Sequence, residues 1–151
     1  MSEFLLFIHS WLRWAILLLG LYVIISSFRG WKGNHPFSAR NNKLSVIFTG
    51  FFHLQVLIGI IIYFFTSKIM EAVFMDFGAA MREGALRFWA VEHILTMVIA
   101  AAVIQIGRSK IKKGESDLKK HKTAFIYFLI GLILVILRIP WNEADRFIRG
   151  M

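Results

Sequence analysis

The sequence predicts an all-α protein: a four-helix transmembrane bundle of up-down-up-down order, with a short interfacial helix between the second and third spans. Composition is the first observation behind this prediction, since 58% of the 151 residues are hydrophobic and 18% are charged. A soluble domain is about 45–50% apolar and about 25% charged, and a small chain buries only about two-thirds of its surface. The other two observations are four long apolar runs and an uneven distribution of basic residues.

The four apolar runs are residues 4–28, 44–66, 88–107 and 123–141. A helix rises about 1.5 Å per residue and the hydrocarbon core is about 30 Å thick, so each run can cross it. Backbone groups in lipid must be hydrogen-bonded within the segment, and these long runs lack the alternation of barrel strands. We therefore expect one integral-membrane domain over residues 1–151. The first run is expected to be retained, because it lacks the basic start and the cleavage site of a signal peptide.

The connection between the second and third runs is the longest one. Its apolar residues recur at helical spacing, and its acidic residues lie elsewhere on the helical wheel. The apolar positions are Ile69, Met70, Val73, Phe74 and Phe77. This pattern predicts a short amphipathic helix on the outer membrane interface, ending at Gly78.

Basic residues predict the orientation of the chain. The first and third connections hold four and seven Lys or Arg residues, whereas the second connection and the C-terminal tail hold five between them. Cytoplasmic loops are enriched in Lys and Arg, so we expect both basic connections in the cytoplasm and both termini outside. The net charge of +9 is thus explained without nucleic acid. The Lys-rich stretch 109–122 is interpreted as a topology signal, although it has the charge to attract anionic lipid.

Ionisable side chains inside a span are costly, and each is a candidate functional residue. We centred each run on the bilayer midplane and converted residue offsets to depths at about 1.5 Å per residue. Five ionisable side chains then gather in the outer half: His9, Arg13, Glu92, His93 and Arg138. A sixth, His53, lies about 3 Å to the inner side.

Imidazole is the metal-binding group that these spans offer. The chain has no cysteine, which excludes iron–sulfur clusters and thiolate zinc sites. Glu92 is the only acid within a run, so a di-iron carboxylate site is excluded as well. No HExxH, GxSxG or P-loop motif occurs, and we do not expect a hydrolase or a transferase. Two facing imidazoles suit haem b, whereas three could hold copper, zinc or non-haem iron.

His9 and His93 are the preferred axial pair for a haem. Their estimated depths differ by only about 3–4 Å, while His53 lies about 10 Å deeper than His93. Arg13 and Arg138 would neutralise the haem propionates, because a guanidinium pairs with a carboxylate in bidentate fashion.

Glu92 has two candidate roles, since it would balance the charge of Arg13 or relay a proton to a nearby quinone. His53 stays a candidate for a second site or a third metal ligand. His35 and His121 lie in polar stretches and are expected to be solvated.

Two other interpretations remain open. The same histidine cluster could hold a non-haem metal or a quinone. Alternatively, the histidines could be hydrogen-bonded packing residues in a small structural membrane subunit without a cofactor. Such a chain could form a homo-oligomer or join a larger complex.

Several stretches carry a resemblance to a known group of proteins. They are residues 5–14 (LLFIHSWLRW), 52–55, 58–59, 87–93 (RFWAVEH), 120–122 and 138–141 (RIPW). Together they resemble small four-span bacterial membrane proteins labelled cytochrome b-like. The start of the first span is also similar to cytochrome b561 proteins, but the last span has no haem-ligating histidine pair. The resemblance implies a haem b protein of the bacterial inner membrane that transfers electrons, with a quinone or a redox partner protein.

The orientation can be tested with an impermeant thiol reagent. Because the chain has no native cysteine, a cysteine introduced at position 2 or 150 is the only labelling site. We expect either cysteine to react in intact cells. If either cysteine reacts only after the cells are broken, the termini lie inside and the predicted orientation is wrong.

Overall fold

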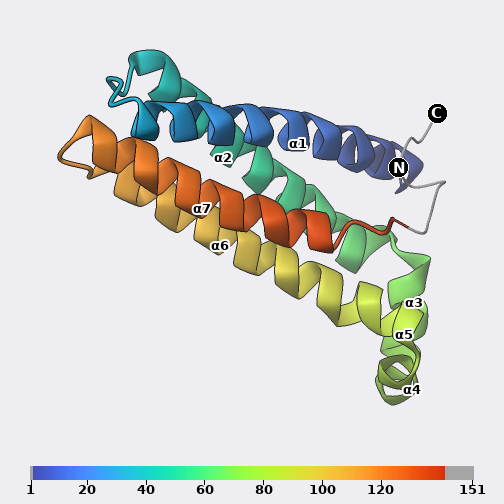
Figure 1. The fold of residues 1–151 in the computed structure, drawn as a ribbon. Helices are drawn as coiled ribbons and strands as arrows, with labels where there is room; N and C mark the ends of the chain where they lie inside the picture. Colours follow the sequence, from blue (N-terminus) through green and yellow to red (C-terminus); the bar gives the residue numbers. More distant parts are fainter. Residues whose placement is uncertain (1, 142–151) are drawn as a thin grey trace.

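The computed structural model describes residues 2–141, and all regular elements in this range are helices (Figure 1). The long helices are α1 (Ser2–Lys32), α2 (Ala39–Ile61), α6 (His93–Lys112) and α7 (Asp117–Leu137). They pack against one another as a bundle, with α7 against both α1 and α6, and α2 against α1 and α6. This arrangement confirms the all-α, four-helix class.

Four helical segments of the described chain are long and apolar enough to cross a membrane. They are Glu3–Lys32, Ala39–Thr66, Gly84–Lys112 and Asp117–Leu137. The four predicted spans are therefore present, but the helices extend past most ends of the apolar runs. The last one instead ends early, because its backbone leaves the helical conformation at Arg138, shortly before Pro140.

Consecutive long helices run in opposite directions (Figure 1). At one end, Gln55 Nε2 of α2 donates to the carbonyl of His9 in α1 at 2.9 Å. At the same end, His93 at the start of α6 contacts the carbonyl of Arg138, which follows α7, at 3.0 Å. The start of α1 thus lies beside the end of α2, and the start of α6 beside the end of α7.

The core lies along the centre of the bundle, where aromatic and β-branched side chains meet. Phe48 of α2 and Phe128 of α7 are fully buried and pack edge to face, with ring centroids 5.1 Å apart. Only 17–33% of the most apolar stretch of each segment is buried inside the bundle, and Leu18 of α1, for example, is 70% exposed. Apolar helices with apolar outer faces indicate a lipid bilayer environment.

The long connection holds three short helices instead of the single one predicted. They are α3 (Lys68–Met75), α4 (Phe77–Arg82) and α5 (Gly84–Arg87). The predicted stop at Gly78 is wrong, because the backbone breaks at Asp76, whose carboxylate caps α4 by accepting from the Ala79 N–H.

The predicted apolar face of this connection is divided between two environments. Met70 and Val73 are buried in a small second core with Ala80 and Ala90. Phe74 and Phe77, by contrast, are more than half exposed. Only part of the face is therefore available to an interface outside the chain.

Two π-helical segments flank these short helices. The first, η1 (Ile62–Thr66), continues α2, and the second, η2 (Phe88–Glu92), leads into α6. In η2 the His93 N–H bonds to the Phe88 carbonyl, five residues back. Because such a turn is wider, it adds a residue and rotates the following side chains by about 100° relative to a continuous α-helix.

Close helix packing at Gly131 offers a test of the bundle. A Cβ added at Gly131 of α7 would lie 2.5 Å from Ile104 Cγ1 of α6, whereas one at Gly50 of α2 would meet nothing within 4 Å. We expect Gly131→Ala to lower the free energy of unfolding by about 1–2 kcal/mol through overpacking. The matched variant Gly50→Ala should leave it unchanged or raise it, because alanine favours the helix. Unfolding in mixed detergent micelles measures both, and equal effects would contradict the packing.

Candidate functional site

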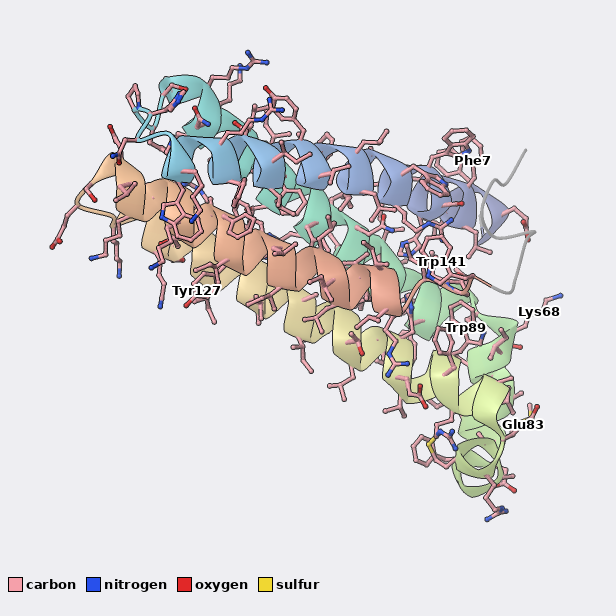
Figure 2. All side chains as sticks on the ribbon, in the orientation of Figure 1. Phe7, Lys68, Glu83, Trp89, Tyr127 and Trp141 are labelled. Atoms are coloured by element: carbon pink, nitrogen blue, oxygen red, sulfur yellow. The ribbon has the colours of Figure 1, made fainter. Side chains whose placement is uncertain are left out.

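A cavity of about 370 Å³ lies at the end of the bundle that carries the short helices. Its walls come from α1, α2, η1, α3, η2, α6, α7 and the residues that follow α7. Lys68 and Trp89, two of its lining residues, mark this end in Figure 2, and Tyr127 marks the opposite end. The space corresponds to on the order of a dozen water molecules, so the cavity is of cofactor size. We call this end the cavity end.

Four of the predicted site residues line this cavity. They are His9 and Arg13 of α1, His93 of α6, and Arg138 after α7. The structure thus brings together residues that are up to 129 positions apart in the sequence. The sequence estimate, which converts residue offsets to depths by the helix rise, had already placed these four residues in the same half of the bundle.

His53 is not part of this group. The buried face of α2 includes Phe52 and Gln55, and His53 lies on the exposed side of the helix. The predicted three-imidazole arrangement is therefore not formed. Within residues 2–141, no group of three or more histidine or acidic side chains is placed to hold a metal ion.

The imidazole of His93 has a defined hydrogen-bond partner. Its Nδ1 lies 3.0 Å from the Arg138 carbonyl oxygen. Since a carbonyl only accepts, Nδ1 donates, and in the neutral ring Nε2 carries the lone pair. Ligating histidines usually donate their other N–H in this way, which fixes the tautomer and the ring orientation. The Trp89 ring, with its centroid 5.4 Å away, packs beside it.

The imidazole of His9 lies against the backbone of α2. Its Cε1 atom is 3.2 Å from the position that a Cβ on Gly59 would take, and Nδ1 is 3.8 Å from it. Glycine at this position therefore permits the contact. Nδ1 is buried and has no hydrogen-bond partner among the described residues.

Gln55 is a polar wall residue that was not among the predicted site residues. Its Nε2 donates to the His9 carbonyl, which fixes the orientation of the amide because an oxygen there would face another oxygen. Its Oε1 is then a buried acceptor without a donor among the described residues. A buried unpaired polar group costs about 1–3 kcal/mol, and a water or a ligand usually completes it. The sequence does indicate this residue, because Gln55 is the only amide side chain within the apolar run 44–66.

Tyr63 of η1 was also missed. Its hydroxyl donates to the Ala90 carbonyl in η2 at 2.8 Å and joins the two π-helical segments across the cavity end. A π-helical turn displaces carbonyls from their usual i+4 donors, and the tyrosine supplies a donor to one of them. π-Helical turns are frequent at functional sites, where they redirect side chains.

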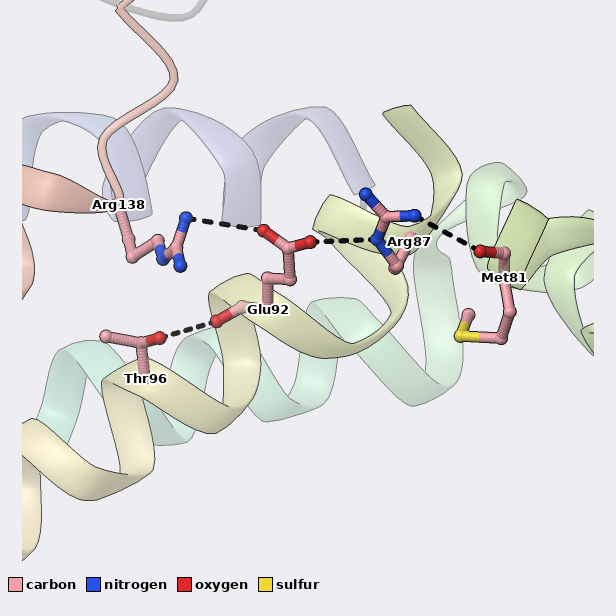
Figure 3. Close-up of polar contacts among 5 residues, drawn as sticks. All are labelled: Met81, Arg87, Glu92, Thr96 and Arg138. Carbon is pink, nitrogen blue, oxygen red and sulfur yellow. Dashed lines mark hydrogen bonds and ion pairs between the residues drawn. The ribbon is translucent and has the colours of Figure 1, made fainter. Parts of the chain in front are cut away.

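Glu92 pairs with different partners from the one predicted (Figure 3). Its Oε1 lies 3.0 Å from Arg87 Nε, and its Oε2 lies 3.3 Å from Arg138 Nη1. The expected pair with Arg13 is not formed, and Arg13 Nη2 instead donates to Ser10 Oγ at 3.2 Å. The extra residue in η2 turns Glu92 away from α1, and both of its carboxylate oxygens are occupied by guanidinium groups.

His121 contradicts the expectation of a solvated side chain. It is 1% exposed, and its ring fills the space above Gly30 of α1 and packs on Phe37, with centroids 4.9 Å apart. It lies at the opposite end of the bundle from the cavity. His35 is exposed, as expected.

Comparison of the chain with protein-family models, with curated proteins and with solved structures finds no significant match.

Proposed function

We propose that the cavity binds haem b, with His9 and His93 as axial ligands, and that the protein transfers electrons in the bacterial inner membrane. One observation carries the proposal: imidazoles from two different helices line a single cavity of cofactor size. The resemblance of the motifs around both histidines to cytochrome b-like proteins points in the same direction.

The rest of the wall has the composition that a haem needs. Apolar side chains, among them Phe52, Met97 and Trp89, suit the macrocycle. Arg13 and Arg138 both line the cavity, and either guanidinium would pair with a propionate. A bound haem would supply one-electron chemistry at its iron.

The chain's own residues would set the properties of that group. The Arg138 carbonyl holds His93 in the tautomer whose Nε2 has a lone pair, and it makes the imidazole a stronger donor. Gly59 leaves room for the Cε1 edge of the His9 ring beside α2, because a side chain at this position would crowd it. The apolar wall excludes water and thereby affects the reduction potential.

The cavity end is proposed to face the outer side of the membrane, with both termini outside. The opposite end carries the two basic connections, which favour the cytoplasm. A lipid-soluble quinone or a redox protein would exchange electrons with the haem. The chain would act alone, as a homo-oligomer, or as a subunit of an oxidoreductase.

Single histidine variants test the proposed ligands. Loss of an outer-shell partner of a metal ligand typically costs 10–100-fold in affinity, so removal of a ligand should cost more than about tenfold. We expect His9→Ala and His93→Ala each to lose the Soret band and the haem of the purified protein. His53→Ala is the matched control, because its side chain faces outward, and it should retain full haem content. Retention in His9→Ala with loss in His53→Ala would refute this pairing.

A second candidate, a quinol site without haem, is favoured by the unpaired Oε1 of Gln55. A quinol hydroxyl can donate to this oxygen, whereas the oxidised quinone cannot. If the purified protein is colourless, we expect a short-chain quinol to quench its tryptophan fluorescence and to bind more tightly than the quinone. Gln55→Leu should remove this preference and Gln55→Glu should keep it.

Metal analysis of the purified protein distinguishes a non-haem metal site from a structural subunit. A colourless protein that contains stoichiometric copper, zinc or iron would favour the metal site. A colourless protein that binds neither metal nor quinol would favour the structural subunit.

A further inference from the structure

A cationic and aromatic cluster occupies the seam between α1 and α7, at the end opposite the cavity. Trp31, in the last turn of α1, has the Lys32 Nζ 4.3 Å and the Lys122 Nζ 5.5 Å from its ring centroid. The two ammonium nitrogens are therefore at most about 10 Å apart, although the residues are 90 positions apart in the sequence. Phe28 and Phe125 support the indole, with centroids 6.4 and 5.8 Å from it.

Neither lysine has a carboxylate within ion-pair distance in the part of the chain that the structure describes. The indole attracts each ammonium through its π-face but carries no charge to neutralise it. Each ammonium keeps N–H donors for another acceptor. The cluster thus holds two positive charges from different helices close together and leaves them uncompensated, which is an arrangement that suits an anion.

Exposed apolar side chains lead from both lysines toward the middle of the bundle. On α1, they recur every three or four residues from Lys32 and are 42–70% exposed: Phe28, Ile25, Leu21 and Leu18. On α7, a similar row leads from Lys122 and is 37–46% exposed: Ile126, Ile130 and Ile133. The cationic cluster therefore lies where the headgroup of a lipid would be, and the apolar rows lie along its acyl chains.

We propose that this cluster, Trp31 with Lys32 and Lys122, is a binding site for the headgroup phosphate of an anionic phospholipid. Charge complementarity selects an anionic lipid over a zwitterionic one, and the apolar rows select a lipid over a free phosphate ion. The site is independent of the cavity and of the group bound there. A topology signal requires only that basic residues gather on one side of the membrane. Here lysines that are 90 positions apart converge on one indole, which such a signal does not require.

Quenching of Trp31 fluorescence by brominated lipids tests the site. The purified full-length protein is placed in phosphatidylcholine vesicles in which a minor fraction is brominated phosphatidylglycerol or, for comparison, brominated phosphatidylcholine. Trp11, Trp14, Trp89 and Trp141 lie at or near the cavity end, so the difference between the wild type and Trp31→Phe isolates the signal of Trp31. We expect brominated phosphatidylglycerol to quench this signal more strongly.

The decisive comparison is between two double variants of equal charge. Lys32→Gln/Lys122→Gln removes the cluster, and Lys112→Gln/Lys113→Gln removes two exposed lysines at the same end of the bundle. A basic residue at an anionic surface contributes about a factor of five, so the first pair should lower the phosphatidylglycerol preference by about ten- to thirtyfold. Because quenching of Trp31 reports lipid at the cluster itself, the second pair should lower this preference by clearly less than the first. All four lysines are exposed, and circular dichroism verifies that the variants fold.

Each other outcome overturns the proposal. Equal losses in the two double variants would show that overall charge alone attracts the lipid. Equal quenching by the two brominated lipids would show that no anionic lipid is preferred. Quenching that inorganic phosphate displaces, without any contribution from the acyl chains, would show that the cluster is a site for free phosphate.

Discussion

The close approach of α7 to its neighbours is the constraint on which the rest of the structure depends. Gly30 accommodates the ring of His121, Gly107 the side chain of Tyr127, and Gly131 the side chain of Ile104, each less than 3 Å from an added Cβ. In lipid, where apolar burial does not drive association between helices, such small residues allow van der Waals contact. These contacts occupy the middle and the basic end of the bundle. The cavity lies at the other end of the bundle, beyond these glycine contacts of α7.

At the cavity end, π-helical turns and hydrogen bonds take the place of the glycine contacts made by α7. η1 and η2 widen the ends of α2 and α6, and the hydroxyl of Tyr63 links them. Glu92 then joins Arg87 to Arg138, and the Arg138 carbonyl holds His93. The residues that shape the cavity are therefore fixed by polar contacts. Apolar side chains line the space, and a few polar atoms remain for a ligand.

The sequence predicted the four spans, and four of the predicted site residues line one cavity, because span length and helix rise are local quantities. Apolar length determines a span, and helix rise brings His9, Arg13, His93 and Arg138 to one level. Rotation about a helix axis was predicted less well, since it depends on packing partners. Phe52 and Gln55 occupy the inner face of α2, so His53 points outward. The π-helical turn in η2 left no clear pattern in the sequence, and the partner of Glu92 was consequently misassigned.

The two ends of the bundle treat charge in opposite ways. At the cavity end, the carboxylate of Glu92 lies between two guanidinium groups, so charges are balanced within the protein. At the other end, Trp31 gathers Lys32 and Lys122 without neutralising them, although Lys119 pairs there with Glu115 at 3.6 Å. A compensated end can surround an apolar cavity without a large desolvation cost, because its ions are already paired. A lysine without a carboxylate partner is stable beside water or anions, and a membrane surface with anionic lipids supplies both. The paired charges and the cavity thus lie at one end of the bundle, and the lysines gathered on Trp31 lie at the other.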